Sequence, residues 1–186
     1  MDENKLTYVV LVIVIIGCLY VYFENNDFDL KCIVSGVDGN KYCVRERSKL
    51  KEASNLLATV TKKCKDLVAY TDEHHGSKEI VKRLVKGFDQ TVIKETLPTS
   101  KFTAYSENKG EKLAFCLNKK KQNNENLIDE HTLMFVAIHE LAHIMTLSIG
   151  HKTEFWDNFK FLLENLQNPL WSSPPTFLSL FYSVLI

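Results

Sequence analysis

The chain has 186 residues, 23 basic and 23 acidic side chains, and 45% hydrophobic residues. This length and composition suit one modest folded domain. The formal net charge of zero gives no argument for binding nucleic acid by long-range attraction, so we expect no nucleic-acid partner.

An uncharged apolar run, Leu6 to Phe23, follows a short N-terminal flank of residues 1–5. A helix of this length rises about 27 Å, close to the hydrocarbon thickness of a bilayer. A cleaved signal peptide or a buried core helix are the alternatives, but the flank lacks the basic start of a signal peptide. Because Lys5 precedes the run and no Lys or Arg follows it before Lys31, the soluble part is expected on the non-cytoplasmic side. The run thus predicts a single-pass membrane anchor.

Residues 29–44 predict a β-hairpin, with Asp38-Gly39 as its turn. Cys32 and Cys43 flank this turn and could pair as a disulfide in an oxidising compartment. The spacing does not force a bridge, and free thiols on the two strands are the preferred interpretation. The sequence has no Cys-x-x-Cys pattern, so a thiolate zinc site is not predicted.

The rest of the predicted domain, residues 27–167, alternates between helical spacing of apolar residues and short β-type runs. Ser77 and Asp129 are expected to cap helices, and Gly150 to end one. The predicted elements are helices over residues 48–70 and 77–88, a hairpin over 101–106 and 112–118, and helices over 130–149 and 153–166. The apolar tail, residues 168–186, ends in a run too short to span a bilayer. It could pack on the domain, lie on a membrane surface, or come from a shifted reading frame.

The chemistry is expected on the helix over residues 130–149. His139 and His143 stand four residues apart, so both imidazoles face one side of that helix. Glu140 comes next to the first histidine, where its carboxylate can reach a water on a metal without being a ligand. This is the arrangement of the His-Glu-x-x-His zinc motif. Glu140 is therefore the predicted general base for a zinc-activated water.

A third metal ligand has to come from outside this helix, because catalytic zinc sites have three protein ligands and an open position. His151 is the preferred candidate, since Gly150 permits a sharp turn before it. Glu164 is the alternative, from the following helix. Asp157 or Glu154 could orient a ligand imidazole, although a solvated carboxylate is the commoner fate. The helix at 153–166 carries Phe and Trp residues that we interpret as core packing.

The opposing interpretation is a buried helix that contains histidines by chance. Burying two imidazoles and a carboxylate without a metal would cost several kcal/mol unless all were paired. The motif also lies on an apolar helix, and a turn and a third histidine follow it. These features favour the metal site.

His139-Glu140-Leu141-Ala142-His143, followed by Gly150-His151 and Phe155-Trp156, resembles the WLM and SprT-like zincin metallopeptidases. The stretch from Cys32 to Leu166 is similar to uncharacterised metallopeptidase-like proteins of large DNA viruses. The segment before the third histidine is longer than in the WLM pattern. The resemblance implies an α+β zincin-like domain, a small sheet beside the active-site helix, and His139, His143 and His151 as zinc ligands. It also implies that the strand at 112–118 is an edge strand that pairs with an extended substrate.

The sequence therefore predicts a membrane-anchored zinc metallopeptidase of α+β class that acts on polypeptides. One alternative is a membrane-tethered zinc-binding scaffold without turnover, in which Glu164 or Asp157 would complete a closed site. The other is a DNA-associated protease of the WLM/SprT kind, against which the predicted anchor and the neutral charge both argue.

Overall fold

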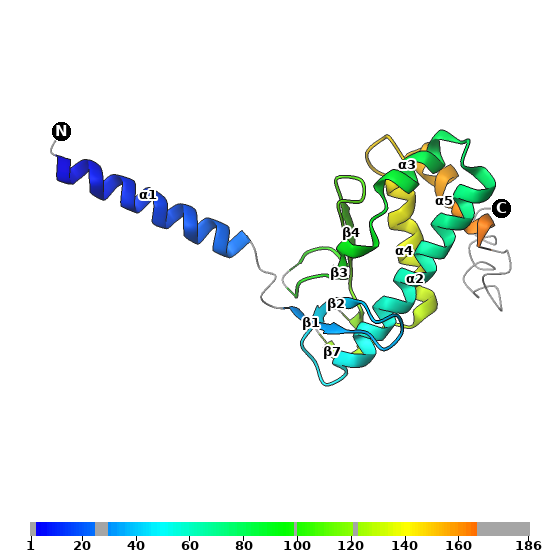
Figure 1. Cartoon of the computed structure of the whole chain (residues 1–186), viewed down its shortest axis with the longest axis horizontal. Helices are drawn as coiled ribbons and strands as arrows, with labels where there is room; N and C mark the ends of the chain where they lie inside the picture. Colours follow the sequence, from blue (N-terminus) through cyan, green and yellow to red (C-terminus); the bar gives the residue numbers. More distant parts are fainter. Residues whose placement is uncertain (1–2, 25–29, 99, 121–122, 167–186) are drawn as a thin grey trace.

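The computed structural model describes residues 3–24, 30–98, 100–120 and 123–166 (Figure 1). The predicted tail, residues 168–186, lies outside these residues. The described elements are α1 (Glu3–Glu24), β1 (Leu30–Val34), β2 (Lys41–Arg45), α2 (Leu50–His75), α3 (Glu79–Gly87), a 3-10 helix (Gln90–Val92), β3 (Ile93–Glu95), β4 (Ala104–Glu107), β5 (Lys112–Phe115), β6 (Asn118–Lys120), β7 (Asn123–Leu127), α4 (Glu130–Met145) and α5 (Thr153–Asn165).

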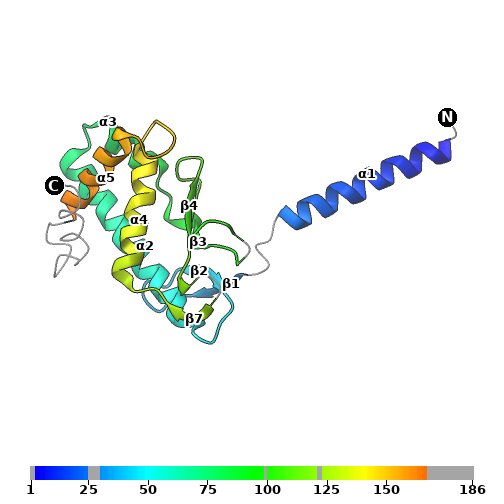
Figure 2. The same ribbon diagram turned by 180° about the vertical axis from the view of Figure 1, so that it is seen from behind.

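The apolar run Leu6–Phe23 lies in α1, which stands apart from the other elements in Figures 1 and 2. Within the part of the chain that the structure describes, no helix is long and apolar enough to cross a membrane. The predicted anchor and the membrane localisation are therefore wrong, and the predicted membrane partner is not supported. The fold class is corrected to a mixed α and β chain in which the N-terminal transmembrane helix is not supported.

The predicted first hairpin is present as β1 and β2, which pair antiparallel. Gly39 adopts φ +72° in its turn, and the Asp38 carboxylate accepts the Asn40 backbone N–H at 3.0 Å. Cys32 and Cys43 are direct partners in the strand register and form a disulfide. The free-thiol interpretation was therefore wrong, because the register brings the two side chains face to face.

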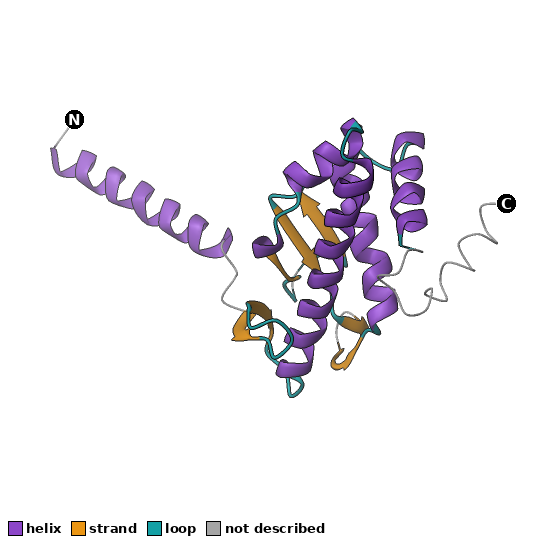
Figure 3. Cartoon of the chain, turned by 45° about the vertical axis from the view of Figure 1, so that its right-hand side comes forward, coloured by secondary structure: helices purple, strands orange, loops and turns teal. Residues whose placement is uncertain are grey.

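Helix α4 lies at the centre of the molecule, between the helices α2, α3 and α5 and the three-stranded sheet (Figures 2 and 3). Asp129 caps its start by accepting the Thr132 backbone N–H at 2.9 Å, as predicted. A mostly apolar helix is stable when most of its surface is covered by other elements. The buried residues of α4 are Leu133, Met134, Ala137, Ile138, Glu140, Leu141, Ala142, Ile144 and Met145.

Helix α4 ends at Met145, four residues before the predicted end at Ile149. The reason is that the backbone N–H groups after Met145 bind a side chain from α5. The N–H groups of Leu147 and Ser148 donate to the Glu154 carboxylate, at 2.9 and 3.1 Å, instead of continuing the helix. Gly150 has φ +80°, but it lies in the loop after α4 and does not terminate the helix. We call residues 146–152 the ligand loop.

Helix α3 also begins differently from the prediction. Its N-cap position is Lys78, with no side-chain cap, so Ser77 does not cap it. Helix α2 ends at His75, five residues after the predicted end at residue 70.

The main sheet has the order β3-β5-β4, with β3 parallel and β4 antiparallel to β5. The strand that the sequence predicted as an edge, residues 112–118, therefore contains the central strand β5. Among the described strands, β4 is the edge on the side of α4. The edge-strand prediction was wrong because β3, an earlier segment of the chain, pairs with β5 on its other side.

A buried ion-pair cluster joins the hairpin to this sheet. The Glu95 carboxylate, on β3, accepts the Arg45 backbone N–H at 2.7 Å and both of its oxygens accept from the Arg47 guanidinium at 2.5 Å. Arg45 also donates to the Thr96 carbonyl at 2.7 Å. Buried charges need such pairing and hydrogen bonding to be tolerated, so the cluster fixes how the hairpin sits on β3.

Gly110, in the turn between β4 and β5, is required by a close backbone contact. It adopts φ +115°, and a Cβ atom there would lie 1.9 Å from the Gly87 carbonyl oxygen at the end of α3. We expect Gly110→Ala to reduce the free energy of unfolding by clearly more than Gly39→Ala. Gly39 also has a positive φ but open space around it, so its substitution should cost only the about 1–2 kcal/mol of backbone strain.

Urea unfolding of both variants, without reductant, measures the difference. Equal losses of stability would contradict the close packing of the β4–β5 turn on α3.

Candidate metal centre

His139 and His143 lie one turn apart on α4, as the i, i+4 spacing predicts. Their ring centroids are 5.0 Å apart and both side chains are half-buried. Because α4 is held on several sides by packed elements, this pair has little freedom to separate.

His151 comes to the same point from the ligand loop. Its Nε2 lies 2.9 Å from Nε2 of His139, and the possible ligand atoms of the three histidines all lie within 4.8 Å of one another. Nitrogens bound to one zinc at about 2.0–2.1 Å in tetrahedral geometry would be about 3.3 Å apart. The three side chains therefore fit one ion with small rotations.

The alternative ligands do not join this group. Glu164 lies on an exposed face of α5, 4.0 Å from Lys160, and Asp157 is exposed. Among the described residues, the possible metal-binding group is His139, His143 and His151 alone. A carboxylate that would close the fourth position is absent from it.

Phe155 forms the floor beneath the three imidazoles. This side chain is fully buried, and its ring centroid lies 4.8, 4.4 and 4.6 Å from those of His139, His143 and His151. The core-packing interpretation of this residue was thus incomplete, since the ring also restricts the orientations of the histidines. Trp156 is 42% exposed and lies 5.9 Å from His151.

Glu140 is buried beside the histidines and faces β4. The Ser106 backbone N–H on β4 donates to its carboxylate, but desolvation is the larger influence and raises the pKa of Glu140 to about 7. A group with such a pKa can both accept and return a proton near neutral pH.

Burial also acts on the histidines, in the opposite direction. Desolvation, and then the nearby His151, lowers the pKa of His139. Desolvation, followed by His139, His151 and Lys109, lowers the pKa of His143 to about 4. Both imidazoles are therefore neutral at pH 7, which is the form that binds a metal.

A cavity of about 630 Å³ opens over these residues. The edge strand β4 forms one wall, the α4 histidines the floor, and the ligand loop the other wall. Two large apolar side chains stand on its rim, Phe102 at 64% and Ile149 at 88% exposure. The arrangement can hold an extended chain against a metal ion and a carboxylate.

Three contributors to this site were not predicted. The Ser106 N–H and Lys109 come from the β4–β5 hairpin, whose approach to α4 no local pattern signals. Glu154 was considered as a partner for a ligand imidazole, but it accepts the backbone N–H groups of the ligand loop instead. These two backbone hydrogen bonds lower the pKa of Glu154.

Removal of one imidazole should weaken metal binding strongly. We expect His151→Ala to raise the zinc dissociation constant by more than the about 10- to 100-fold that loss of a supporting outer residue costs. The matched control is His75→Ala, because His75 bonds Asn165 on another part of the surface.

Calorimetric titration with zinc measures both affinities. Unchanged binding by His151→Ala would exclude this histidine as a ligand.

Comparison with known proteins gives relatives but no family. No family model matches the chain. An uncharacterised protein of Acanthamoeba polyphaga mimivirus is 25% identical over 160 residues, which cover 84% of this chain and 80% of that protein. An uncharacterised protein of Invertebrate iridescent virus 6 is 38% identical over 50 residues, 27% of this chain and 28% of that protein. Both relatives are viral proteins, in agreement with the viral resemblance noted from the sequence.

Among solved structures, the crystal structure of Wss1 from Saccharomyces cerevisiae is similar at a TM-score of 0.39 and 17% identity. The similarity covers 63% of this chain and 73% of Wss1. A score this low carries neither a fold nor an activity to this chain, so the functional argument depends on the residues of the site.

Proposed function

We propose that the protein is a zinc-dependent metallopeptidase that hydrolyses peptide bonds. The observation that carries this proposal is the convergence of three imidazoles, without a carboxylate among them, next to a buried glutamate in an open cavity. Catalytic zinc sites combine three protein ligands with an open position, whereas structural sites are closed by four.

His139, His143 and His151 would hold the ion, and their neutral state suits this role. Bound zinc would supply Lewis acidity, which polarises a carbonyl group and lowers the pKa of water. Zinc is the proposed ion because catalytic zinc sites commonly use three imidazole ligands. Imidazole nitrogens also suit other transition metals, so the donor set does not by itself select zinc.

Glu140 is the proposed general base. Its carboxylate would accept a proton from the attacking water and later give it to the leaving amine. The Ser106 backbone N–H on β4 also interacts with this carboxylate, on the side of the cavity that β4 forms. The raised pKa of Glu140 favours the first step, because a more basic carboxylate accepts the proton of the attacking water more readily.

The proposed substrate is a polypeptide in extended conformation. Strand β4 is bonded to β5 on one side only among the described strands, and it borders the cavity on the other. Exposed N–H and C=O groups of an edge strand can pair with an added strand. This role now belongs to β4 and not to the central strand β5, on which the sequence-based prediction placed it.

A zinc-binding scaffold without turnover is the competing function. It would not need a buried carboxylate beside an open cavity, and neither Glu164 nor Asp157 lies in the histidine group. A DNA-associated protease has lost one of the two arguments against it, since the anchor is no longer supported. The neutral net charge still gives that alternative no electrostatic support.

Replacement of Glu140 separates binding from catalysis. We expect Glu140→Gln to retain zinc and to lose about 10²- to 10⁴-fold in the rate of casein hydrolysis, because the amide cannot accept the proton. Glu164→Gln is the matched control, and its rate should equal that of the unchanged protein.

Zinc content and casein hydrolysis are measured on the same preparations. Equal hydrolysis by Glu140→Gln would rule out the general-base role. A zinc-loaded protein that cleaves no unfolded polypeptide would favour the scaffold.

A further inference from the structure

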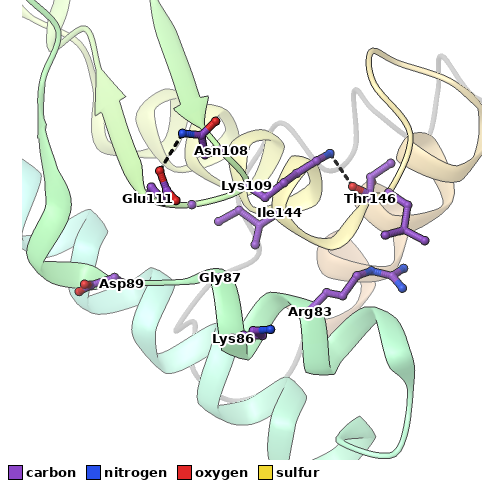
Figure 4. A pocket seen from close by; sticks show the side chains of 11 residues that line it. Arg83, Lys86, Gly87, Asp89, Asn108, Lys109, Glu111, Ile144 and Thr146 are labelled. Atoms are coloured by element: carbon purple, nitrogen blue, oxygen red, sulfur yellow. Dashed lines mark hydrogen bonds between the residues drawn. The ribbon is translucent and has the colours of Figure 1, made fainter.

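Lys109 reaches from the β4–β5 turn to the end of α4 (Figure 4). Its ammonium group donates to the carbonyl oxygens of Thr146 at 2.6 Å, His143 at 3.2 Å and Ser148 at 3.3 Å. An ammonium group has three N–H donors, so these three carbonyls use all of them. The last carbonyls of a helix have no partner within the helix, and a cation there also interacts favourably with the helix dipole.

The three carbonyls belong to the path between two proposed ligands. One is on His143 itself, and the other two are in the ligand loop that leads to His151. The same loop is held from its N–H side by Glu154, through Leu147 and Ser148. Lys109 therefore binds carbonyl oxygens of this segment, and Glu154 binds its backbone N–H groups.

The turn that carries Lys109 is itself fixed. Asn108 and Lys109 adopt φ values of 47° and 60°, and Gly110 packs against the Gly87 carbonyl. The Asn108 side chain donates to Glu111 at 2.7 Å (Figure 4). These contacts place the Lys109 backbone on a packed turn, from which its side chain extends to the ligand loop.

We propose that Lys109 is a positioning residue of the metal centre. It holds the end of α4 and the ligand loop in the conformation that presents His151 to His139 and His143. It also connects the ligand loop to β4, the proposed substrate strand, because Lys109 lies in the turn that follows β4. This inference rests on the proposed zinc site.

A simpler role would be that of a helix cap, which stabilises α4 without regard to metal. The two roles differ in a measurable way. A cap lowers the melting temperature when it is lost, but the protein that remains folded binds zinc as before. A positioning residue changes the zinc affinity of the folded protein, because the loop then samples conformations in which His151 points away.

The test compares Lys109→Met, which keeps the aliphatic stem but removes all three donors, with Lys109→Arg, which keeps charge and donors. Lys86→Met is the matched control, since Lys86 is an exposed lysine on α3 that lines, together with Lys109, a second cavity of about 480 Å³. Zinc affinity is measured by chelator competition on folded full-length protein, and hydrogen exchange of the Leu147 and Ser148 amides on the metal-free form.

We expect Lys109→Met to raise the zinc dissociation constant about 10- to 100-fold and to speed exchange of both amides. Lys109→Arg should recover most of the affinity, and Lys86→Met should match the unchanged protein. If Lys109→Met does not fold, Lys109→Gln, which keeps two donors without charge, carries the same comparison.

Lys109→Met could instead lower only the melting temperature and leave zinc affinity and amide exchange unchanged. This result would contradict the positioning role and show that Lys109 is only a helix cap. Failure of the proposed function looks different, because the unchanged protein itself would then bind no zinc.

Discussion

The site depends on two imidazoles that are fixed one turn apart on a helix packed on several sides, with the imidazoles facing an open cavity. Spacing alone places His139 and His143 on one face, but many helices carry such pairs without a shared orientation. Here α4 is enclosed by α2, α3, α5 and the sheet, and Phe155 packs beneath both rings. The apolar surroundings also withdraw water from the rings, which keeps them neutral and ready to bind a cation.

The third imidazole is held by a different kind of interaction. The ligand loop has no regular hydrogen-bond ladder, so its backbone groups are satisfied from outside by Lys109 and Glu154. This explains why α4 stops at Met145, although its sequence could continue as a helix. The hydrogen bonds of a further helical turn are replaced by charge-assisted hydrogen bonds to Lys109 and Glu154, and such bonds are about twice as strong as neutral ones. The early stop is what allows His151 to turn back toward the α4 pair.

Sequence patterns predicted the parts of the fold that local chemistry controls. The hairpin turn at Asp38-Gly39, the Asp129 cap and the helical spacing of the two motif histidines all depend on residues within four positions of one another. The patterns failed where distant segments decide. The end of α4 depends on Glu154, the order of the sheet depends on β3, and the Cys32–Cys43 disulfide depends on strand register.

The same division applies to the candidate site. His151 was preferred over Glu164 because a glycine precedes it, and the structure brings this histidine to the α4 pair. The roles of Ser106 and Lys109 could not be predicted in the same way, because no local sequence pattern indicates that the β4–β5 hairpin packs against α4. The apolar run near the N-terminus predicted an anchor that the structure does not support, since no helix among the described residues is long and apolar enough to cross a membrane.

X-ray absorption at the zinc edge, on the zinc-loaded full-length protein, tests the central claim most directly. Three imidazole nitrogens at about 2.0–2.1 Å, with one oxygen ligand from solvent and no sulfur, are the result that a site built from His139, His143 and His151 predicts. A spectrum with thiolate ligands at about 2.3 Å, or with fewer than three imidazoles, would contradict it.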